Sequence, residues 1–498
     1  MFKRKIICYT VIVLLFIAAI NTVKVYGEDL KKPLLDLPHV VGDDLLPDAF
    51  MPEESREKTG IEDSSGFFSF AYGRFHSSTY DIKQSARGDN FYYTARINID
   101  DSGGERDNSK FTTYRPSFEL GIPFDRENEA VFKVNYFNKI MNLPGKMDAL
   151  TPGAKRKNTD FEISAQFIRG LDNGQVKIEP YYGRSILDED INRRDFRNKL
   201  LGTRINFEAD ENEVKIDAFD NKLVDRYEHL ITDAKIRLKP IPLDEQWQFR
   251  LGANIFAQEG FGQRPSPYVE LMFSSQEDSS HKLKATREFA PLVFREIYLN
   301  DNFVEATPLE LRPRRKSIIS YEFDKYVSRE WRTNLVIYVQ QDKDLWFWND
   351  PDNNGLYSPE IIEKVNFGGI KISTEYTWSE AFSHFISLNL RSITSKDPDY
   401  EFVPFEPKQR IAVGLTYKID ERFKMDITGD YFGRRFFQGN SKESFSAYFL
   451  LASKLTYQLK DYLTLFVLVD NLLNDHYEIV KGYPSQSRSA LAGASVKF

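Results

Sequence analysis

Apolar and polar side chains alternate one by one along most of this chain. A clear example runs from 411 to 419, where the apolar or aromatic positions are Ile411, Val413, Leu415, Tyr417 and Ile419. After a short polar turn at 420–422 the alternation resumes and continues to Ile427. A period of two is typical of a β-strand with one apolar face. The stretch therefore predicts an antiparallel hairpin.

The same alternation recurs in roughly twenty segments of about ten residues each, which is the length of a tilted strand in a transmembrane barrel. The segments extend from Gly66 to Phe498, which ends the chain. The apolar side chains of the last segment are Ala490, Ala492, Ala494 and Val496. Because lipid tolerates no open sheet edge, we expect this last strand to pair with the first.

Composition alone leaves a membrane barrel and a soluble β fold open. With 40 Phe, 26 Tyr and 5 Trp, the chain fits a membrane barrel, a large soluble β-sandwich or a β-propeller. The second face of the strands favours the barrel, because it carries full charges and must face water. Aromatic residues also gather where the apolar faces end, and short connections alternate with long ones. We predict an all-β fold, a transmembrane antiparallel outer-membrane β-barrel of about 20–22 strands.

Charged and amide side chains on the second face are the candidates for lining the lumen and setting its selectivity. These lumen-facing candidates are Lys424, Asp426, Lys454, Gln458, Arg96 and Glu162.

The first 27 residues predict a secretory signal peptide. A basic start at 3–5 precedes an apolar run at 6–20, and cleavage is expected after Gly27. An uncleaved anchor helix is the alternative, although the run is short for a membrane span. The only cysteine, Cys8, lies in this segment, so the mature chain has no disulfide or thiolate metal site. We expect an exported protein of a Gram-negative-type outer membrane.

The C-terminal third carries a series of recognisable elements. An Asn-Leu-x-Asn element and a Tyr follow the penultimate strand, a Gly-Tyr-Pro…Arg loop comes next, and an aromatic residue closes the terminal strand. The residues are Asn471, Leu472, Asn474, Tyr477, Gly482, Tyr483, Pro484, Arg488 and Phe498. This pattern resembles the barrel of the TonB-dependent outer-membrane receptors. The resemblance implies a terminal strand that serves as the address for the outer-membrane barrel assembly machinery.

The chain departs from that family in one respect. Its members carry a globular plug between signal and barrel, which fills the lumen, and no plug motif is visible here. We expect the barrel at 65–498 to lack a plug domain, which puts energy-coupled uptake in doubt. A barrel of this size without a plug predicts a wide aqueous pore, unless loops, a tail or another protein narrows it.

The segment at 28–64 is one candidate for narrowing the pore. It holds eleven acidic side chains against four basic ones, and its prolines disfavour regular structure. Its apolar clusters are typical of segments that order on binding. Three interpretations stay open: a disordered periplasmic tail, a constriction inserted in the lumen, and a docking segment for a periplasmic partner or a TonB-like protein.

The leading functional prediction is a porin-like channel for passive or partner-gated passage of a small or oligomeric solute. The alternatives are a non-transporting anchor or outlet barrel of a periplasmic export complex, and a receptor whose plug is a separate polypeptide. The six histidines are scattered singly, so no catalytic residues and no enzyme are predicted. We also predict no metal site, no cofactor and no nucleic-acid partner.

One basic patch remains to be explained. Its members are Arg312, Arg314, Arg315 and Lys316. They fit a cationic stripe for anionic solutes or an exported acidic polysaccharide, contact with phosphates of lipopolysaccharide in the outer-membrane lipid, or a solvated loop.

Overall fold

The computed structural model describes residues 64–498 except 89, 106–108, 144, 147–148, 151–154, 190–193, 225–226, 276–278, 292, 294–311 and 350–357. The predicted signal peptide and the acidic segment up to residue 63 lie outside the described residues. No helix within the described part is long and apolar enough to cross a membrane.

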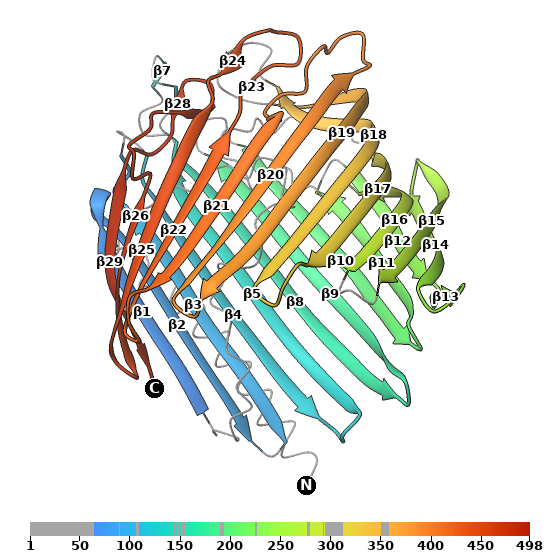
Figure 1. The fold of residues 1–498 in the computed structure, drawn as a ribbon, viewed down its shortest axis with the longest axis horizontal. Helices are drawn as coiled ribbons and strands as arrows, with labels where there is room; N and C mark the ends of the chain where they lie inside the picture. Colours follow the sequence, from blue (N-terminus) through green and yellow to red (C-terminus); the bar gives the residue numbers. More distant parts are fainter. Residues whose placement is uncertain are drawn as a thin grey trace.

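Twenty-two long strands form a single closed wall (Figure 1). They are β1 (Ser64–Gly73), β2 (Ser77–Gly88), β3 (Phe91–Ser102), β4 (Phe111–Pro123), β5 (Asn128–Asn142), β8 (Lys155–Leu171), β9 (Gly174–Glu189), β10 (Arg194–Ala209), β11 (Asn212–Leu223), β12 (Tyr227–Arg237), β14 (Trp247–Gln258), β15 (Gly262–Ser275), β16 (Ser279–Ala290), β17 (Arg314–Tyr326), β18 (Trp331–Asn349), β19 (Ser358–Ser379), β20 (Phe382–Ser395), β21 (Gln409–Lys418), β22 (Phe423–Phe432), β25 (Tyr448–Lys460), β26 (Leu463–Asp470) and β29 (Ser489–Lys497). The predicted all-β class and strand number are confirmed.

Short elements decorate the connections. They are η2 (Arg74–His76), β6 (Gly145–Lys146), β7 (Ala149–Leu150), β13 (Ile241–Pro242), β23 (Arg435–Phe436), β24 (Ser444–Phe445), β27 (Glu478–Val480) and β28 (Tyr483–Pro484). β13 extends the wall beside β14, and the other short strands pair among themselves. Within the described residues every long strand belongs to the wall, and none builds a separate domain inside it.

The ring closes between its first and last strands. β1 pairs antiparallel with both β2 and β29, in a register that sets Phe67 opposite Lys497. The backbones of Gly66 and Phe498 then exchange two hydrogen bonds. A side chain at Gly66 would overlap the Phe498 ring, so the glycine makes room for it. The seam leaves no strand of the wall with an open edge, as a membrane barrel requires.

Apolar side chains cover the outer face of the wall. On β26, Leu465 and Val467 are 39% and 40% exposed, although a soluble protein would bury such a row. They lie opposite Ala494 and Ala492 of β29, so the apolar face of the terminal strand also points outward. An exposed apolar surface on a closed barrel is the surface that hydrocarbon covers.

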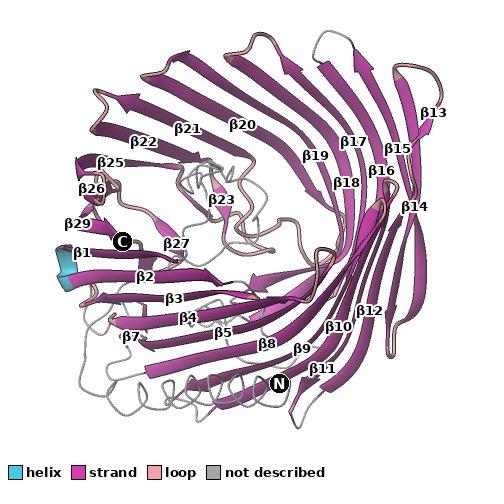
Figure 2. Cartoon of the chain, turned by 90° about the horizontal axis from the view of Figure 1, so that it is seen from below, coloured by secondary structure: helices cyan, strands magenta, loops and turns pink. Residues whose placement is uncertain are grey.

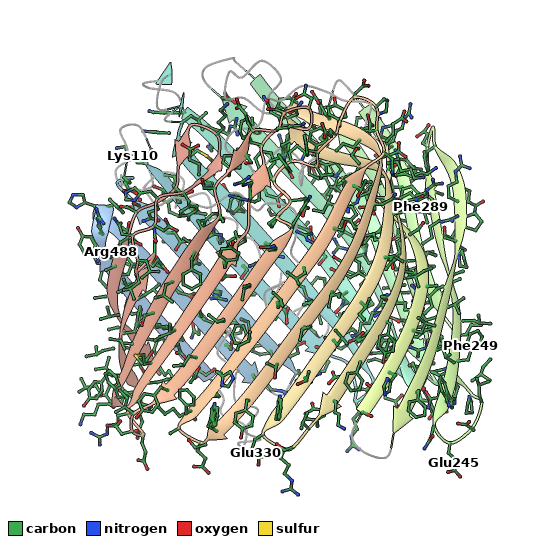
Figure 3. All side chains as sticks on the ribbon, turned by 45° about the horizontal axis from the view of Figure 1, so that its top comes forward. Lys110, Glu245, Phe249, Phe289, Glu330 and Arg488 are labelled. Carbon is green, nitrogen blue, oxygen red and sulfur yellow. The ribbon has the colours of Figure 1, made fainter. Side chains whose placement is uncertain are left out.

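The two ends of the barrel differ. Connections are short at the end that carries the C-terminus and the turns of Glu245 and Glu330, and longer loops gather at the end of Lys110 and Arg488 (Figure 3). Outer-membrane barrels place short turns in the periplasm and long loops outside. We therefore refer to the first end as periplasmic and to the second as extracellular.

The predicted alternation of short and long connections is interrupted over part of the extracellular end. The connections at 224–226 and 259–261 on that side are only three residues long. At the second, Gly260 and Gly262 take positive φ angles of 79° and 84°, which glycine adopts without strain. Strand lengths also vary more than expected, from 8 residues in β26 to 22 in β19.

Candidate functional site

Four of the six predicted lumen-facing residues lie on the inner face of β22 and β25. They are Lys424, Asp426, Lys454 and Gln458. Asp426 is directly opposite Lys454, and its carboxylate lies 3.0 Å from Nζ of Lys424. It also accepts a 2.7 Å hydrogen bond from Oγ1 of Thr416. An ion pair within β22 and a hydrogen bond from the neighbouring β21 therefore hold the Asp426 carboxylate.

Arg96 lies on a different part of the inner wall. From β3 it donates two hydrogen bonds to Asp81 of β2, of 2.9 Å from Nε and 2.6 Å from Nη2. It borders a hollow of about 540 Å³ that Arg115, Asn135 and Asp160 also line. The hollow spans β3, β4, β5 and β8, so it is built by strands far from β22 and β25.

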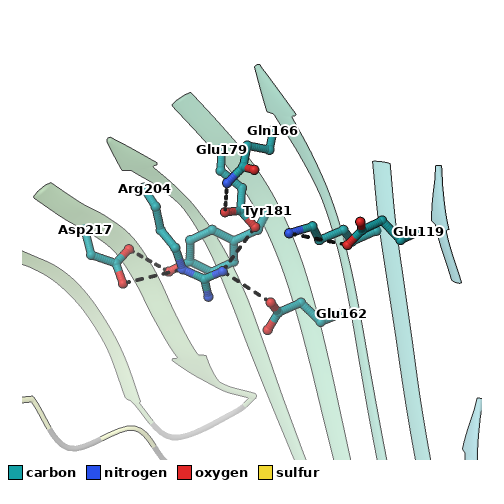
Figure 4. Close-up of polar contacts among 8 residues, drawn as sticks. Glu119, Glu162, Gln166, Glu179, Tyr181, Arg204 and Asp217 are labelled. Carbon is teal, nitrogen blue, oxygen red and sulfur yellow. Dashed lines mark hydrogen bonds and ion pairs between the residues drawn. The ribbon is translucent and has the colours of Figure 1, made fainter. Parts of the chain in front are cut away.

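Glu162, the sixth residue, belongs to an ionic network around Arg204 of β10 (Figure 4). Nη1 of Arg204 lies 3.3 Å from Oε1 of Glu162 and 3.4 Å from Oε1 of Glu179, and its Nε lies 3.9 Å from Oδ2 of Asp217. The guanidinium carbon lies 3.9 Å from the centre of the Tyr181 ring. Three carboxylates thus surround one guanidinium that rests on an aromatic face.

Two further hydrogen bonds fix this network. The Tyr181 hydroxyl donates to Oδ1 of Asp217 at 3.0 Å, and Nε2 of Gln166 donates to Oε2 of Glu179 at 3.2 Å. Beside it, Nζ of Lys133 lies 3.6 Å from Oε2 of Glu119. Of these residues only Glu162 was singled out from sequence. The other members become recognisable only from the strand register. That register sets Glu179 and Asp217 directly opposite Arg204 on the two neighbouring strands.

The structure divides the basic patch between the two faces of the wall. Arg314 points inward, where its Nε donates to Oδ2 of the fully buried Asp342 at 3.2 Å. Lys316 lies opposite Asp342 and shares that inner face. Arg315 lies on the outer face between them, and Arg312 precedes the strand and is exposed. The four cations therefore make no common stripe.

The residues of the C-terminal series hold the connection at 471–488 in shape. Asn471 has a φ of 48°, and its Nδ2 donates to the carbonyls of Asp475 and Gln486 at 2.9 and 3.1 Å. Asn474, with a φ of 57°, accepts a 2.8 Å hydrogen bond from the Arg488 amide. Asparagine tolerates this left-handed region better than most residues, which gives both positions a physical reason.

Comparison with known proteins places these features in context. No family model matches the chain. The vitamin B12 transporter BtuB of Vibrio vulnificus (strain YJ016) is 23% identical over 244 residues, which make up 48% of this chain and 36% of BtuB. The chain thus matches about a third of the length of this curated relative.

Solved structures share the whole barrel. The copper transporter OprC superposes on 89% of this chain and 81% of its own, with a TM-score of 0.71 and 12% identity. A mutant of the ferric enterobactin receptor PfeA from Pseudomonas aeruginosa superposes on 88% of this chain and 81% of its own. Its TM-score is 0.71 and its sequence identity is 13%. The siderophore receptor PirA from Acinetobacter baumannii also matches, with a TM-score of 0.69 and 11% identity.

The chain shares the barrel fold of these outer-membrane transporters and receptors. This fold agrees with the apolar outer face and with the closed seam of the wall.

Over the mouth of this barrel, extracellular connections pack against one another. β23 and β27 lie inside the outline of the ring when it is viewed from the periplasmic end, and at the extracellular end in the side view (Figures 1 and 2). Phe402 stacks on Phe436 with ring centres 4.0 Å apart, and the Phe405 amide donates to the Phe436 carbonyl at 2.8 Å. The connections at 396–408 and 433–447 are joined in this way.

A buried arginine ties the third connection to the same cluster. Arg435 is 2% exposed, and its Nη2 donates to the Glu478 carbonyl at 3.1 Å. Its guanidinium lies over the ring of Tyr448 at 5.0 Å, and Tyr448 stacks on Tyr477 at 4.3 Å. Burial raises the pKa of the Tyr477 phenol and lowers that of the Arg435 guanidinium. The barrel therefore carries packed loops across part of its extracellular mouth.

The inner wall of the barrel offers charged and hydrogen-bonding groups at several places. Within the described residues no group of three or more His, Cys, Asp or Glu side chains converges to hold a metal ion. The arrangement suits transient contacts with a polar solute, because each charge is held by neighbours on the wall and still borders the lumen.

Proposed function

We propose that this chain is an outer-membrane channel that carries a small or oligomeric polar solute, passively or under the control of a partner. The observation that carries the proposal is the contrast between the faces of the closed wall. The outer face is apolar, whereas the inner face holds the ionic groups of Arg96, Arg204 and Lys424. A lumen lined in this way supports water and polar solutes.

The relatives and structural neighbours agree with a transport role, since their names describe transporters and receptors and not enzymes. TonB-dependent receptors contact TonB at the periplasmic side. We extend this to the segment at 28–64 and propose that it contacts a periplasmic partner or a TonB-like protein, or narrows the lumen. The packed loops at 396–408, 433–447 and 471–488 narrow the mouth from the other side.

Single-channel conductance in planar bilayers tests this proposal. The full chain, purified from outer membranes, is compared with a variant that keeps residues 1–27 and lacks 28–63. We expect small currents from the full chain and larger, steady currents from the variant, because the deletion leaves the wall from Ser64 onward intact.

Large currents from both proteins would identify a passive pore in which the segment has no gating role. Silence from both, with folded barrels, would overturn the channel proposal. It would leave the anchor or outlet barrel and the receptor with a separate plug polypeptide, which co-purification of periplasmic proteins distinguishes.

A further inference from the structure

Four cations stand side by side on the outer face of the wall near its extracellular end. They are Arg315 of β17, Lys343 of β18, Lys364 of β19 and Lys396, which follows β20. Arg315 is directly opposite Lys343, and Lys343 is directly opposite Lys364. The Lys396 amide donates to the Lys364 carbonyl at 2.9 Å, which extends the row by one strand. We call these residues the outer cationic row.

The side chains of the row point toward the membrane and not into the lumen. Side chains two positions apart on a strand share a face. Arg315 therefore shares the outer face with Ile319, which is 55% exposed, and Lys343 shares it with Val339, which is 58% exposed. Lys364 likewise shares it with Ile370, which is 41% exposed.

The outer face changes in the same order on all four strands toward their extracellular ends. First comes an apolar or aromatic row, then a row with Ile319 and Val339, then a row of uncharged polar residues, and then the cations. The uncharged polar row consists of Ser317, Gln341, Asn366 and Thr394. The cations thus follow directly where the lipid-facing surface ends, which is the level of lipid headgroups.

The described part of the wall does not neutralise this row. Among the described residues no acidic side chain forms an ion pair with any of its four members, and Asp344 and Glu363, which adjoin it in sequence, make none either. Arg314, one position before Arg315, shows the opposite arrangement, because it faces inward and binds Asp342. Like charges at directly opposite positions destabilise a sheet. Four cations in register therefore favour the binding of anions that the described wall does not supply.

A second outer row gives the contrast. On β9, β10 and β11 the cations Arg184, Lys199 and Lys222 also lie opposite one another. That row ends at Glu228 of β12, which lies opposite Lys222 and forms an ion pair with it. The row on β17–β20 has no such acid, so its demand for an external anion is greater.

We propose that the outer cationic row binds the phosphate groups of an anionic glycolipid in the outer leaflet, of the lipopolysaccharide type. Neighbouring strands lie about 4.8 Å apart, so the row spans roughly 14 Å and can contact more than one phosphate of the same headgroup. Arg287 of β16 flanks the row at the position opposite Ser317 and donates a 3.2 Å hydrogen bond to its hydroxyl. The proposal rests on the outer-membrane location and is independent of channel activity.

The test measures lipid retention by the full chain with native mass spectrometry. The purified protein is incubated with bisphosphorylated lipid A, with its dephosphorylated form, or with inorganic phosphate. The variant Arg315→Gln/Lys343→Gln/Lys364→Gln/Lys396→Gln removes the row. The control Arg329→Gln/Lys418→Gln/Arg422→Gln/Lys460→Gln removes the same charge from exposed positions at the periplasmic end. Heat-modifiable gel mobility verifies that each barrel is folded.

We expect the row variant to lose at least about tenfold in retention of bisphosphorylated lipid A, and the control to stay within about twofold of the wild type. Raised ionic strength weakens the wild-type binding, because the contacts are between exposed charges. A Lys343→Arg/Lys364→Arg/Lys396→Arg variant keeps the charge and should retain the lipid, which makes the test independent of packing changes.

Three results would overturn the proposal. The first is equal retention by the row variant and the wild type. The second is an equal loss in the control, which would reduce the effect to net charge. The third is equal binding of the dephosphorylated lipid, or saturation by inorganic phosphate alone without any lipid. A barrel that is silent in bilayers but binds the lipid would reject the channel and keep this inference.

Discussion

Arg204 on the inner wall and Lys343 in the outer cationic row belong to the same sheet and are neutralised in different ways. Arg204 has three carboxylates within 4 Å, contributed by β8, β9 and β11. Lys343 has a cation directly opposite it on each side. The wall thus supplies the counter-charges of Arg204, whereas its described residues supply none for the outer cationic row. Inner charges should govern permeation and stability, and outer ones the attachment of lipid.

The largest expected effect comes from removing the inner cation. Arg204→Met leaves Glu162, Glu179 and Asp217 without the guanidinium they share, so we expect a loss of about 1–3 kcal/mol in the free energy of unfolding. Cation selectivity of the pore should rise. Urea unfolding in vesicles and the reversal potential in bilayers measure the two effects.

A matched control for this substitution is Arg332→Met at the periplasmic end. Arg332 pairs with the single carboxylate of Asp324 and is 47% exposed, so its loss should cost less than about 1 kcal/mol. Equal losses for the two variants would remove the distinction between a shared inner cation and a surface ion pair.

A finer change tests whether the aromatic member of the network contributes through its hydroxyl. Tyr181→Phe removes the donor to Asp217 and keeps the ring under Arg204, so we expect a loss of about 1 kcal/mol. Tyr462→Phe serves as control, because that side chain is 57% exposed at a periplasmic turn. An unchanged urea midpoint in the Tyr181 variant would assign the stabilisation to the ring alone.

The smallest effect should follow from giving the outer row an acid of its own. Asn366→Asp adds a carboxylate beside Lys364 on the outer face, and it keeps the oxygen that accepts from Gln341. Stability in detergent should rise by about 0.5 kcal/mol, while retention of bisphosphorylated lipid A should fall several-fold. Asn135→Asp adds the same charge to the inner wall and should leave lipid retention unchanged. The same decrease in both variants would show that net charge, and not the row, controls lipid binding.

Most of the fold could be predicted from the alternation of apolar and polar residues, because lipid outside and water inside impose a period of two on every strand. The alternation identified the hairpin around 420–422 and the outward face that ends at Val496. Closure of the wall followed from the cost of an open edge in lipid. Each of these features follows from whether a side chain faces lipid or water, so a single sequence suffices to predict them.

Side-chain contacts between strands could not be predicted from the alternation. The network around Arg204 requires the register of four strands, and register is set by turns whose geometry alternation does not specify. The basic patch stays open in the sequence between a cationic stripe, contact with lipopolysaccharide phosphates and a solvated loop, because the apolar signal of β17 ends before the strand does. Arg314 and Arg315 therefore looked like parts of a loop, although the strand sends them to opposite faces.

The seam between β1 and β29 also constrains the order of events during biogenesis. The ring cannot close until the strand of Lys497 is available to pair with the strand of Phe67. Until then the sheet has two unpaired edges. Loop closure over this length is slow, and open edges invite pairing with other chains. A nascent barrel of this kind depends on being kept apart from its copies until its last strand arrives. A substitution at Gly66, where the Phe498 ring must fit, would lower the yield of assembled barrel more than it would change the properties of the assembled protein.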